Sequence, residues 1–339
     1  MTLLGFDVSR RHLLICGFSL AALAVVAASP QLLGHQVAAG FDGLDSATPV
    51  WLWTGALAFV AALTSAGWAW RSALGCCGAR ICHGDAAARY AVGSLVNSLT
   101  PAKIGTAVRL ALYSRAVEGE GRVWTTSGVG AVIGAAQAFW LTALVAIATV
   151  AGVLPLWPLA ALLGIVGVTG LAMVVAARWR PSARIGHLLD AFRALDSSPR
   201  SALVILAWMG LGMAGRLGAA ASVCAAFGVR NPIAAAFLII PAVDLAATLP
   251  LTPGNLGVAS AAVAVALKAH GVTAAMAMSI GIGFSAVETS ASLAFGTASV
   301  LYLAARAPGA RRWTFAVAAA AGCAALAGAF SFTVLVPLA

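Results

Sequence analysis

Charged residues are scarce in this sequence of 339 residues, of which Asp, Glu, Lys and Arg together make up only 9%. A soluble domain carries roughly 25% of such residues, so the chain lacks the polar surface that contact with water requires. Hydrophobic residues make up 62%, and the mean hydropathy is +0.98. Most of the surface must therefore face lipid. We expect an all-α integral membrane protein whose residues 1–339 form a single polytopic domain.

Acidic residues are rarer than basic residues, with 10 Asp and Glu against 20 Lys and Arg. The net charge of +10 would suit nucleic acid, but the basic residues cluster in short segments between apolar runs. This is the positive-inside bias of inserted proteins, so we expect no nucleic-acid partner. It predicts a cytoplasmic N-terminus, an exterior C-terminus and a surface linker over about residues 178–200. The Ala-, Gly- and Arg-rich composition indicates a bacterial cytoplasmic membrane.

Cysteine is also infrequent, with six residues in the chain. Cys76, Cys77, Cys82 and His83 lie together in one expected cytoplasmic loop. Their spacing matches no standard zinc pattern, so we expect neither a metal nor another cofactor. A thiolate–imidazole metal site is the alternative to a reduced cluster beside the membrane.

Long apolar segments make up most of the sequence. A membrane-spanning helix needs about 20 apolar residues, and the runs predict about six full spans plus two re-entrant, broken helical hairpins. The first span is expected near residues 13–33. In the next, Trp51 and Trp53 at one end and Trp68 and Trp70 at the other fit the two interfacial aromatic belts.

Two apolar segments are interrupted by polar residues and prolines. Tyr90–Ser114 contains Pro101, and the stretch on each side of that proline is too short to cross the bilayer. Ile233–Lys268 is broken in the same way by Pro241, Pro250 and Pro253. We expect the first hairpin to enter from the cytoplasm and the second from the exterior. Two thin spans over residues 233–268 are an alternative.

The two broken segments share a motif. Residues 99–107 read LTPAKIGTA and residues 251–259 read LTPGNLGVA. The helices that follow also match, with Gly130, Gly134 and Gln137 corresponding to Gly281, Ser285 and Glu288. Since the hairpins enter from opposite faces, we expect an inverted-topology repeat, the architecture of many secondary transporters. Repeat 1 covers about 50–154, repeat 2 about 201–304, and a final helix 313–338.

Each motif also has the pattern of a helix start. Thr100 and Thr252 suit the N-cap, and Pro101 and Pro253 suit the first helical position. Two half-helix N-termini would then point towards the membrane centre, where they favour an anion. Lys103 in the first turn opposes the helix dipole, which an anionic partner explains; the alternative is that it snorkels to the cytoplasmic surface.

Four charged residues lie inside the apolar segments: Arg109, Arg216, Asp244 and Glu288. A charge at the centre of a spanning helix costs roughly 2.5–3.5 kcal/mol on insertion scales, so each needs a physical reason. One hypothesis is a structural ion pair between Arg216 and either Asp244 or Glu288. The other is that Arg109 and Arg216 bind a phosphate, while gating or coupling falls to Asp244, Glu288 and Gln137. Glu288 shares a helical stripe with small residues that should face the bundle: Gly281, Ser285, Ser292, Gly296 and Ser299.

At these motifs the chain resembles the lysylphosphatidylglycerol synthase transmembrane-region family, which includes the flippase domain of the multiple peptide resistance factor and stand-alone relatives. The first family motif is matched by Asn97, Pro101, Lys103, Gly105 and Arg109, with Lys in place of Arg. The second is matched by Pro250, Thr252, Pro253, Gly254, Leu256 and Gly257, with Asn255 in place of Gly. The chain departs from the family's acidic positions at Thr106 and at Ala259 and Ser260.

The resemblance implies a lipid flippase for an anionic or phosphate-containing amphiphile, such as an aminoacylated phospholipid or a polyprenyl-phosphate conjugate. The expected substrate-binding residues are Asn97, Thr100, Pro101, Lys103, Gly105, Arg109, Arg216, Thr252, Pro253, Gly254, Asn255 and Gly257. Membrane lipids are the expected partners, together with a second copy of the chain or a lipid-modifying enzyme. Aminoacyl transfer in the family resides in a separate soluble domain, so we expect a transporter and not an enzyme.

Two other functions are open. A membrane glycosyltransferase with a polyprenyl-linked donor would use acids in the first exterior loop, where Asp42 and Asp45 lie. A small-solute secondary transporter would use Glu288 to carry protons.

Overall fold

The computed structural model describes residues 47–100, 104–119, 121–178, 198–247 and 256–306. Within these ranges every regular element is an α-helix, in the order α3 (Pro49–Cys76), α4 (His83–Leu99), α5 (Ile104–Ser114), α6 (Arg122–Val150), α7 (Leu156–Arg178), α9 (Pro199–Ala226), α10 (Pro232–Ala246), α11 (Leu256–Ala269) and α12 (Ala274–Arg306). The expected all-α membrane architecture is confirmed. The first span at 13–33 and the final helix at 313–338 lie outside the described residues.

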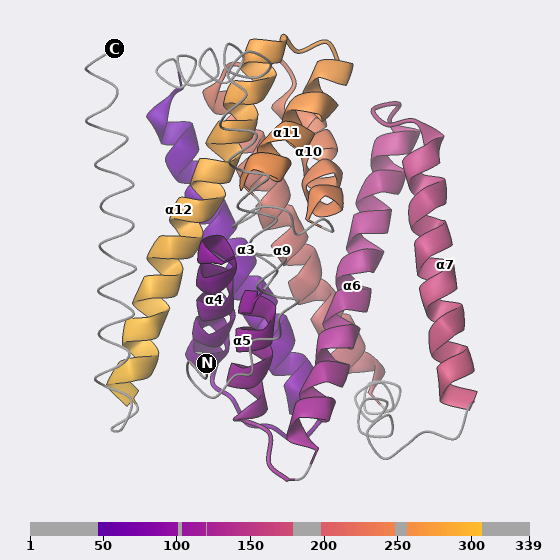
Figure 1. The fold of residues 1–339 in the computed structure, drawn as a ribbon, viewed down its shortest axis with the longest axis vertical. Coiled ribbons are helices and arrows are strands. Elements are labelled where there is room, and N and C mark those ends of the chain that lie inside the picture. The colour runs from indigo at the N-terminus through magenta and orange to yellow at the C-terminus, as the bar shows by residue number, and fades with distance from the viewer. Residues whose placement is uncertain (1–46, 101–103, 120, 179–197, 248–255, 307–339) are drawn as a thin grey trace, which may run out of the picture.

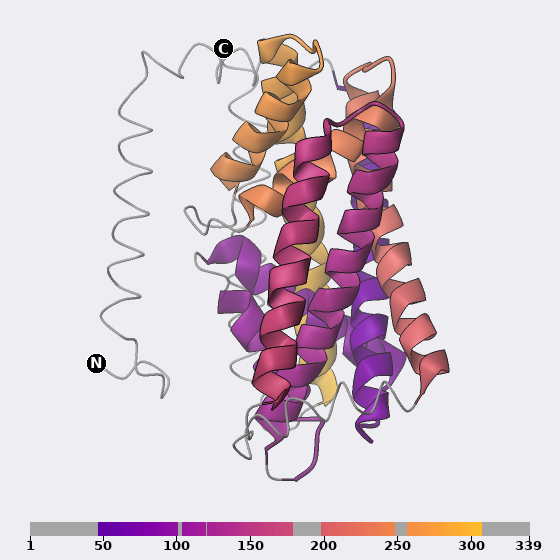
Figure 2. The same cartoon turned by 90° about the vertical axis from the view of Figure 1, so that its right-hand side faces the viewer.

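Four of the described helices are long and apolar enough to cross a membrane: α3, α6, α9 and α12. They run along the long axis of the bundle (Figure 1). Helix α7 lies beside α6 at the edge of the bundle, as the turned view in Figure 2 also shows.

Helices α3 and α9 form the most extensive helix–helix interface in the described part of the chain. Small residues bring their backbones close together, as membrane helices require because lipid supplies little hydrophobic drive for their association. A Cβ on Gly215 would lie only 2.8 Å from the backbone oxygen of Ala58, and one on Gly55 only 3.3 Å from that of Ala219. This pair is the framework against which α4, α6, α10 and α12 pack.

The two broken segments form helical hairpins, α4–α5 and α10–α11, which lie towards opposite ends of the bundle (Figures 1 and 2). The first hairpin begins at His83, seven residues before its predicted start, and the second runs from Pro232 to Ala269. Helices α10 and α11 have 15 and 14 residues. At 1.5 Å per residue, neither reaches across a hydrocarbon core of about 30 Å. These lengths favour a hairpin over two thin spans at residues 233–268.

The tryptophans of α3 follow the prediction at one end only. Trp51 and Trp53 are exposed, as an interfacial belt requires. Trp70 is buried and stacks on Tyr113, with ring centroids 4.7 Å apart and planes at 4°. Its assignment to the second belt is therefore wrong, because α5 covers this end of α3. Trp68 packs edge-on against Trp208 of α9.

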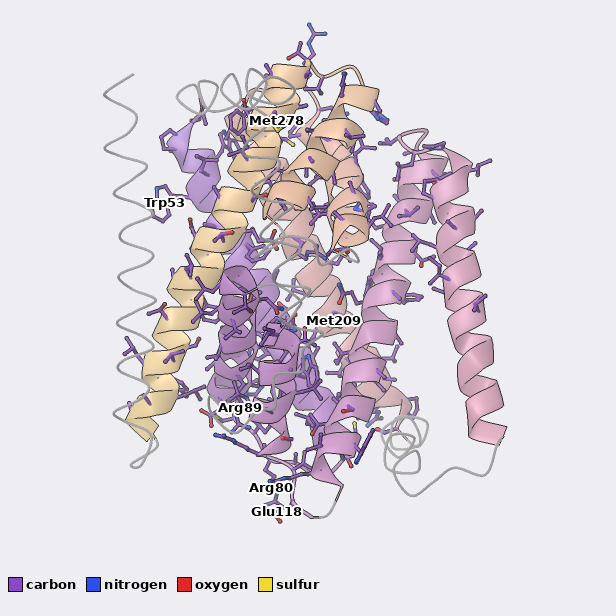
Figure 3. All side chains as sticks on the ribbon, in the orientation of Figure 1. Trp53, Arg80, Arg89, Glu118, Met209 and Met278 are labelled. Carbon is purple, nitrogen blue, oxygen red and sulfur yellow. The ribbon has the colours of Figure 1, made fainter. Side chains whose placement is uncertain are left out.

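Basic residues gather at one end of the bundle. Helix α3 ends there and α6 and α9 begin there, and Arg80 and Arg89 mark this end in Figure 3. The arginines at this end include Arg71, Arg80, Arg89, Arg115, Arg122 and Arg200. The opposite end holds Arg230, in the loop between α9 and α10, and Lys268, in the last turn of α11. The described part of the chain thus has one strongly basic end, the asymmetry expected of a protein oriented by its positive charges.

Candidate functional site

Two glycines bring the arms of the first hairpin into backbone contact. A Cβ on Gly93 of α4 would lie 2.8 Å from the Cβ of Arg109 and 3.0 Å from the backbone oxygen of Gly105. A Cβ on Gly105 of α5 would in turn lie 2.5 Å from Asn97 Oδ1. Real Cβ atoms do not make contacts this short, so neither position tolerates a side chain without movement of the backbone. The requirement for Gly105 in the motif is therefore steric.

Arg109 lies across α4 in the space that Gly93 leaves. Its guanidinium carbon is 3.7 Å from the centroid of the Tyr90 ring, which is a cation–π contact. Among the described residues, neither its buried Nε nor the buried Oδ1 of Asn97 has a hydrogen-bond partner. Buried polar atoms nearly always have such partners. The hairpin therefore holds a positively charged donor whose hydrogen-bonding capacity is unfilled by the described protein.

Arg216 on α9 forms a bidentate pair with Asp244 on α10. The two hydrogen bonds run from Nη1 to Oδ2 at 3.0 Å and from Nη2 to Oδ1 at 2.5 Å. Both side chains are largely buried, with exposed fractions of 19% and 13%. The sequence left Asp244 and Glu288 as possible partners of Arg216, and in the structure Asp244 forms the ion pair. Glu288 on α12 also interacts electrostatically with Arg216, so this residue faces acids on two helices, α10 and α12.

Helix α12 presents its small residues to the bundle, as predicted. Ser285, Ser292 and Ser299 are at most 5% exposed, and Gly281 and Gly296 are buried. Two of the serines join α12 to the hairpins. Ser292 lies 3.1 Å from the hydroxyl of Ser94 in α4, and Ser285 lies 2.8 Å from that of Ser260 in α11. One helix thus contacts both hairpins through matched hydroxyl pairs.

The remaining predicted site residues within the described ranges lie at the end of α4 or at exposed positions of α6 and α11. Thr100 ends α4, where its hydroxyl donates to the backbone oxygen of Val96 at 2.6 Å. Gln137 and Gly257 are exposed. Six predicted residues lie outside the described part of the chain, and with them the predicted N-termini of the half-helices: Pro101, Lys103, Thr252, Pro253, Gly254 and Asn255.

No group of three or more His, Cys, Asp or Glu side chains within the described ranges is arranged to hold a metal ion. Cys82 instead acts as the N-cap of α4, its sulfur accepting a hydrogen bond from the backbone N–H of Asp85 at 3.4 Å.

The sequence model of the protein family described as the lysylphosphatidylglycerol synthase TM region matches residues 14–296 of this chain. The chain belongs to that family. A comparison with curated proteins gives no match.

The structure describes the three positions at which this chain is expected to differ from the motifs of the lysylphosphatidylglycerol synthase TM family. Thr106, the first of these positions, is exposed on α5. Ala259 and Ser260, near the acidic position of the second motif, are buried, and Ser260 contacts Ser285.

Sequence reasoning did not identify Tyr90 or Gly93 as site residues. Both share a face of α4 with Asn97, at spacings of three and four residues, where helix positions are neighbours. An aromatic residue and a glycine in register with a motif asparagine were therefore the available signal. The Ser94–Ser292 contact had no such signal, because its partners are 198 positions apart.

Proposed function

We propose that this protein is a lipid translocase, which moves an anionic or phosphate-containing amphiphile, such as an aminoacylated phospholipid or a polyprenyl-phosphate conjugate, across the membrane. The observation that carries the proposal is Arg109, held against Tyr90 with a buried Nε that has no partner among the described residues. A phosphate oxygen satisfies such a donor, and arginine's planar fork suits phosphate.

The Arg216–Asp244 pair takes the coupling role in this proposal. Arg216 already uses both terminal nitrogens on Asp244, so we assign phosphate binding to Arg109. A second acid, Glu288, lies within electrostatic range of the pair. A change of partner between Asp244 and Glu288 would give the pair two arrangements, which a transport cycle requires.

The repeat architecture belongs to the same proposal. Hairpins α4–α5 and α10–α11 lie towards opposite ends of the bundle (Figure 1), and each packs against a long helix of its own half, α3 or α9. This supports an inverted-topology repeat with the transport site between the halves. The basic end would face the cytoplasm of a bacterial cell. We propose a transporter without enzymatic activity, and membrane lipids as its partners, with a second copy or a lipid-modifying enzyme as further ones.

The test is lipid movement in vesicles that contain the purified full chain and a fluorescently labelled anionic phospholipid. A hydrogen bond to a charged group contributes about 1.5–3 kcal/mol, so Arg109→Gln should slow movement by about tenfold or more. Arg115→Gln is the matched control, because Arg115 is an exposed arginine that immediately follows α5. Equal rates in wild type and Arg109→Gln, with both proteins folded, would remove Arg109 from the site.

A proton-coupled small-solute transporter is the second candidate, favoured by the position of Glu288 beside the Arg216–Asp244 pair. Solute uptake that follows an imposed pH gradient and disappears in Glu288→Gln, without any lipid movement, would select it. The glycosyltransferase alternative rests on Asp42 and Asp45, which lie outside the described residues.

A further inference from the structure

A cavity of about 600 Å³ lies at the basic end of the bundle, away from the hairpin contacts of Arg109. Three segments line it: the end of α3, the loop that joins α3 to α4, and the start of α9. Ligand sites typically have volumes of about 300–1,000 Å³. The cavity is therefore large enough for a lipid headgroup.

Each of the three segments contributes one arginine: Arg71 from α3, Arg80 from the loop and Arg200 from α9. The described residues that line the cavity include no acid. Arg71 is held in place, because its Nε donates to the backbone oxygen of Ile81 at 2.9 Å. This bond leaves the terminal nitrogens of Arg71 as donors. The start of α9 adds the positive end of a helix dipole, so the whole lining favours an anion.

The position of the cavity indicates that the anion belongs to a lipid. It lies where the spanning helices α3 and α9 end and begin, which is the depth of headgroups, and Arg80 marks this end in Figure 3. Val204 of the lining is 45% exposed, and its neighbour Leu203 is 66% exposed. Acyl chains can lie along this apolar face of α9 while the phosphate occupies the cavity.

We infer that this cavity is a docking site for the phosphate of a net-anionic phospholipid in the leaflet that the basic end faces. A zwitterionic headgroup would place its cation among three arginines without an acid in the described lining, so it should bind more weakly. The site is separate from Arg109, and it holds whether or not the chain translocates lipid.

The test is native mass spectrometry of the full chain in detergent, titrated with phosphatidic acid. Each basic residue near a charged surface contributes an interaction that corresponds to about a fivefold change in affinity. Arg80→Gln and Arg200→Gln should each weaken binding about fivefold, and the double variant more strongly. Both side chains are exposed, and neither has the loop-holding contact of Arg71, so this pair tests the cavity with the least risk to folding. Arg115→Gln and Arg122→Gln are the controls, since both are exposed near the same end but do not line the cavity.

Four ligands, three lipids and one headgroup without acyl chains, test which chemical groups the cavity recognises. Phosphatidic acid should bind more tightly than phosphatidylcholine and than diacylglycerol, which lack a net negative charge. Glycerol 3-phosphate, which has the headgroup without acyl chains, should bind far more weakly than phosphatidic acid. Equal binding of all three lipids, tight binding of glycerol 3-phosphate, or an R80Q/R200Q variant that retains wild-type affinity would each overturn the inference.

Discussion

At the scale of single residues, the membrane-embedded charges fall into two chemical situations. Arg109 rests on an aromatic ring and keeps an unfilled donor, whereas Arg216 donates to Asp244 from both terminal nitrogens. Because a charge inside a bilayer costs free energy, each of these residues was expected to have a structural or functional role. The sequence left two acids open for Arg216, since Asp244 and Glu288 lie on different helices whose relative positions depend on tertiary packing. Tyr90 shares a helix face with Asn97, but its spacing alone did not indicate the contact with Arg109.

The pairing of Arg216 with Asp244 leads to a prediction about stability. Removing one partner leaves an uncompensated buried charge, which costs about 3–5 kcal/mol, whereas apolar replacement of both is often nearly neutral. Arg216→Leu and Asp244→Leu should each lower the thermal stability of the protein in detergent, and the double variant should recover much of the loss. Tryptophan fluorescence during heating measures this.

The same double variant separates the two roles of the pair. If the pair only stabilises the fold, the double variant should transport lipid at the wild-type rate once it is folded. We expect it to be folded but slow, because its switch between arrangements is gone. Wild-type transport by a stable double variant would contradict the coupling role.

At the scale of elements, hydropathy and prolines predicted which segments span and which turn back. Helices α3, α6, α9 and α12 follow from runs longer than about 20 apolar residues. The start of the first hairpin was predicted seven residues too late. Helix α4 begins at His83 because Cys82 caps it, and its first turns are too polar for a hydropathy criterion to detect. The burial of Trp70 could not be predicted from hydropathy, because it depends on tertiary packing that stacks Tyr113 of α5 on the Trp70 ring.

Glycine contacts within the elements give the second stability prediction. Gly105→Ala forces a Cβ against Gly93 and Asn97, and overpacking of this kind costs about 1–3 kcal/mol. Gly134→Ala is the matched control: Gly134 is helical and exposed, and no atom lies within 4 Å of its added Cβ. Alanine there should be neutral or stabilising, because it is the better helix former.

Thermal unfolding of the two glycine variants, compared with transport by each, checks this prediction. Gly105→Ala should lose both stability and lipid movement, because the displaced hairpin no longer presents Arg109. If Gly105→Ala behaves like Gly134→Ala, the close packing of the hairpin is not required for activity.

At the scale of the whole molecule, α12 is the element that connects the two hairpin regions. Its hydroxyl contacts run from Ser292 to Ser94 and from Ser285 to Ser260. The charge distribution and the internal motif predicted hairpins at opposite ends of the bundle, and Figure 1 shows α4–α5 and α10–α11 at these positions. Neither signal predicted that one helix would contact both. That arrangement depends on which face of α12 meets each hairpin, and so on packing across nearly the whole bundle.

If the hairpins shift against α12 during transport, tying them to it should stop the cycle. Oxidised Ser94→Cys/Ser292→Cys and Ser260→Cys/Ser285→Cys pairs each place two sulfurs at positions whose hydroxyls are 3.1 and 2.8 Å apart. These distances allow a disulfide after small adjustments. We expect lipid movement to be lost on oxidation in a background without native cysteines, and to return on reduction.

The control disulfide should tie two helices that remain together throughout the cycle. A Cβ on Gly55 lies 3.5 Å from that of Ser222, which is within the range for a disulfide, so Gly55→Cys/Ser222→Cys joins α3 to α9. This variant should transport equally well oxidised and reduced, since those two helices form the framework. Loss of transport only in the α3–α9 disulfide would reverse the assignment of framework and moving parts. Full transport by both oxidised hairpin variants would mean that the lipid passes over hairpins that stay fixed to α12.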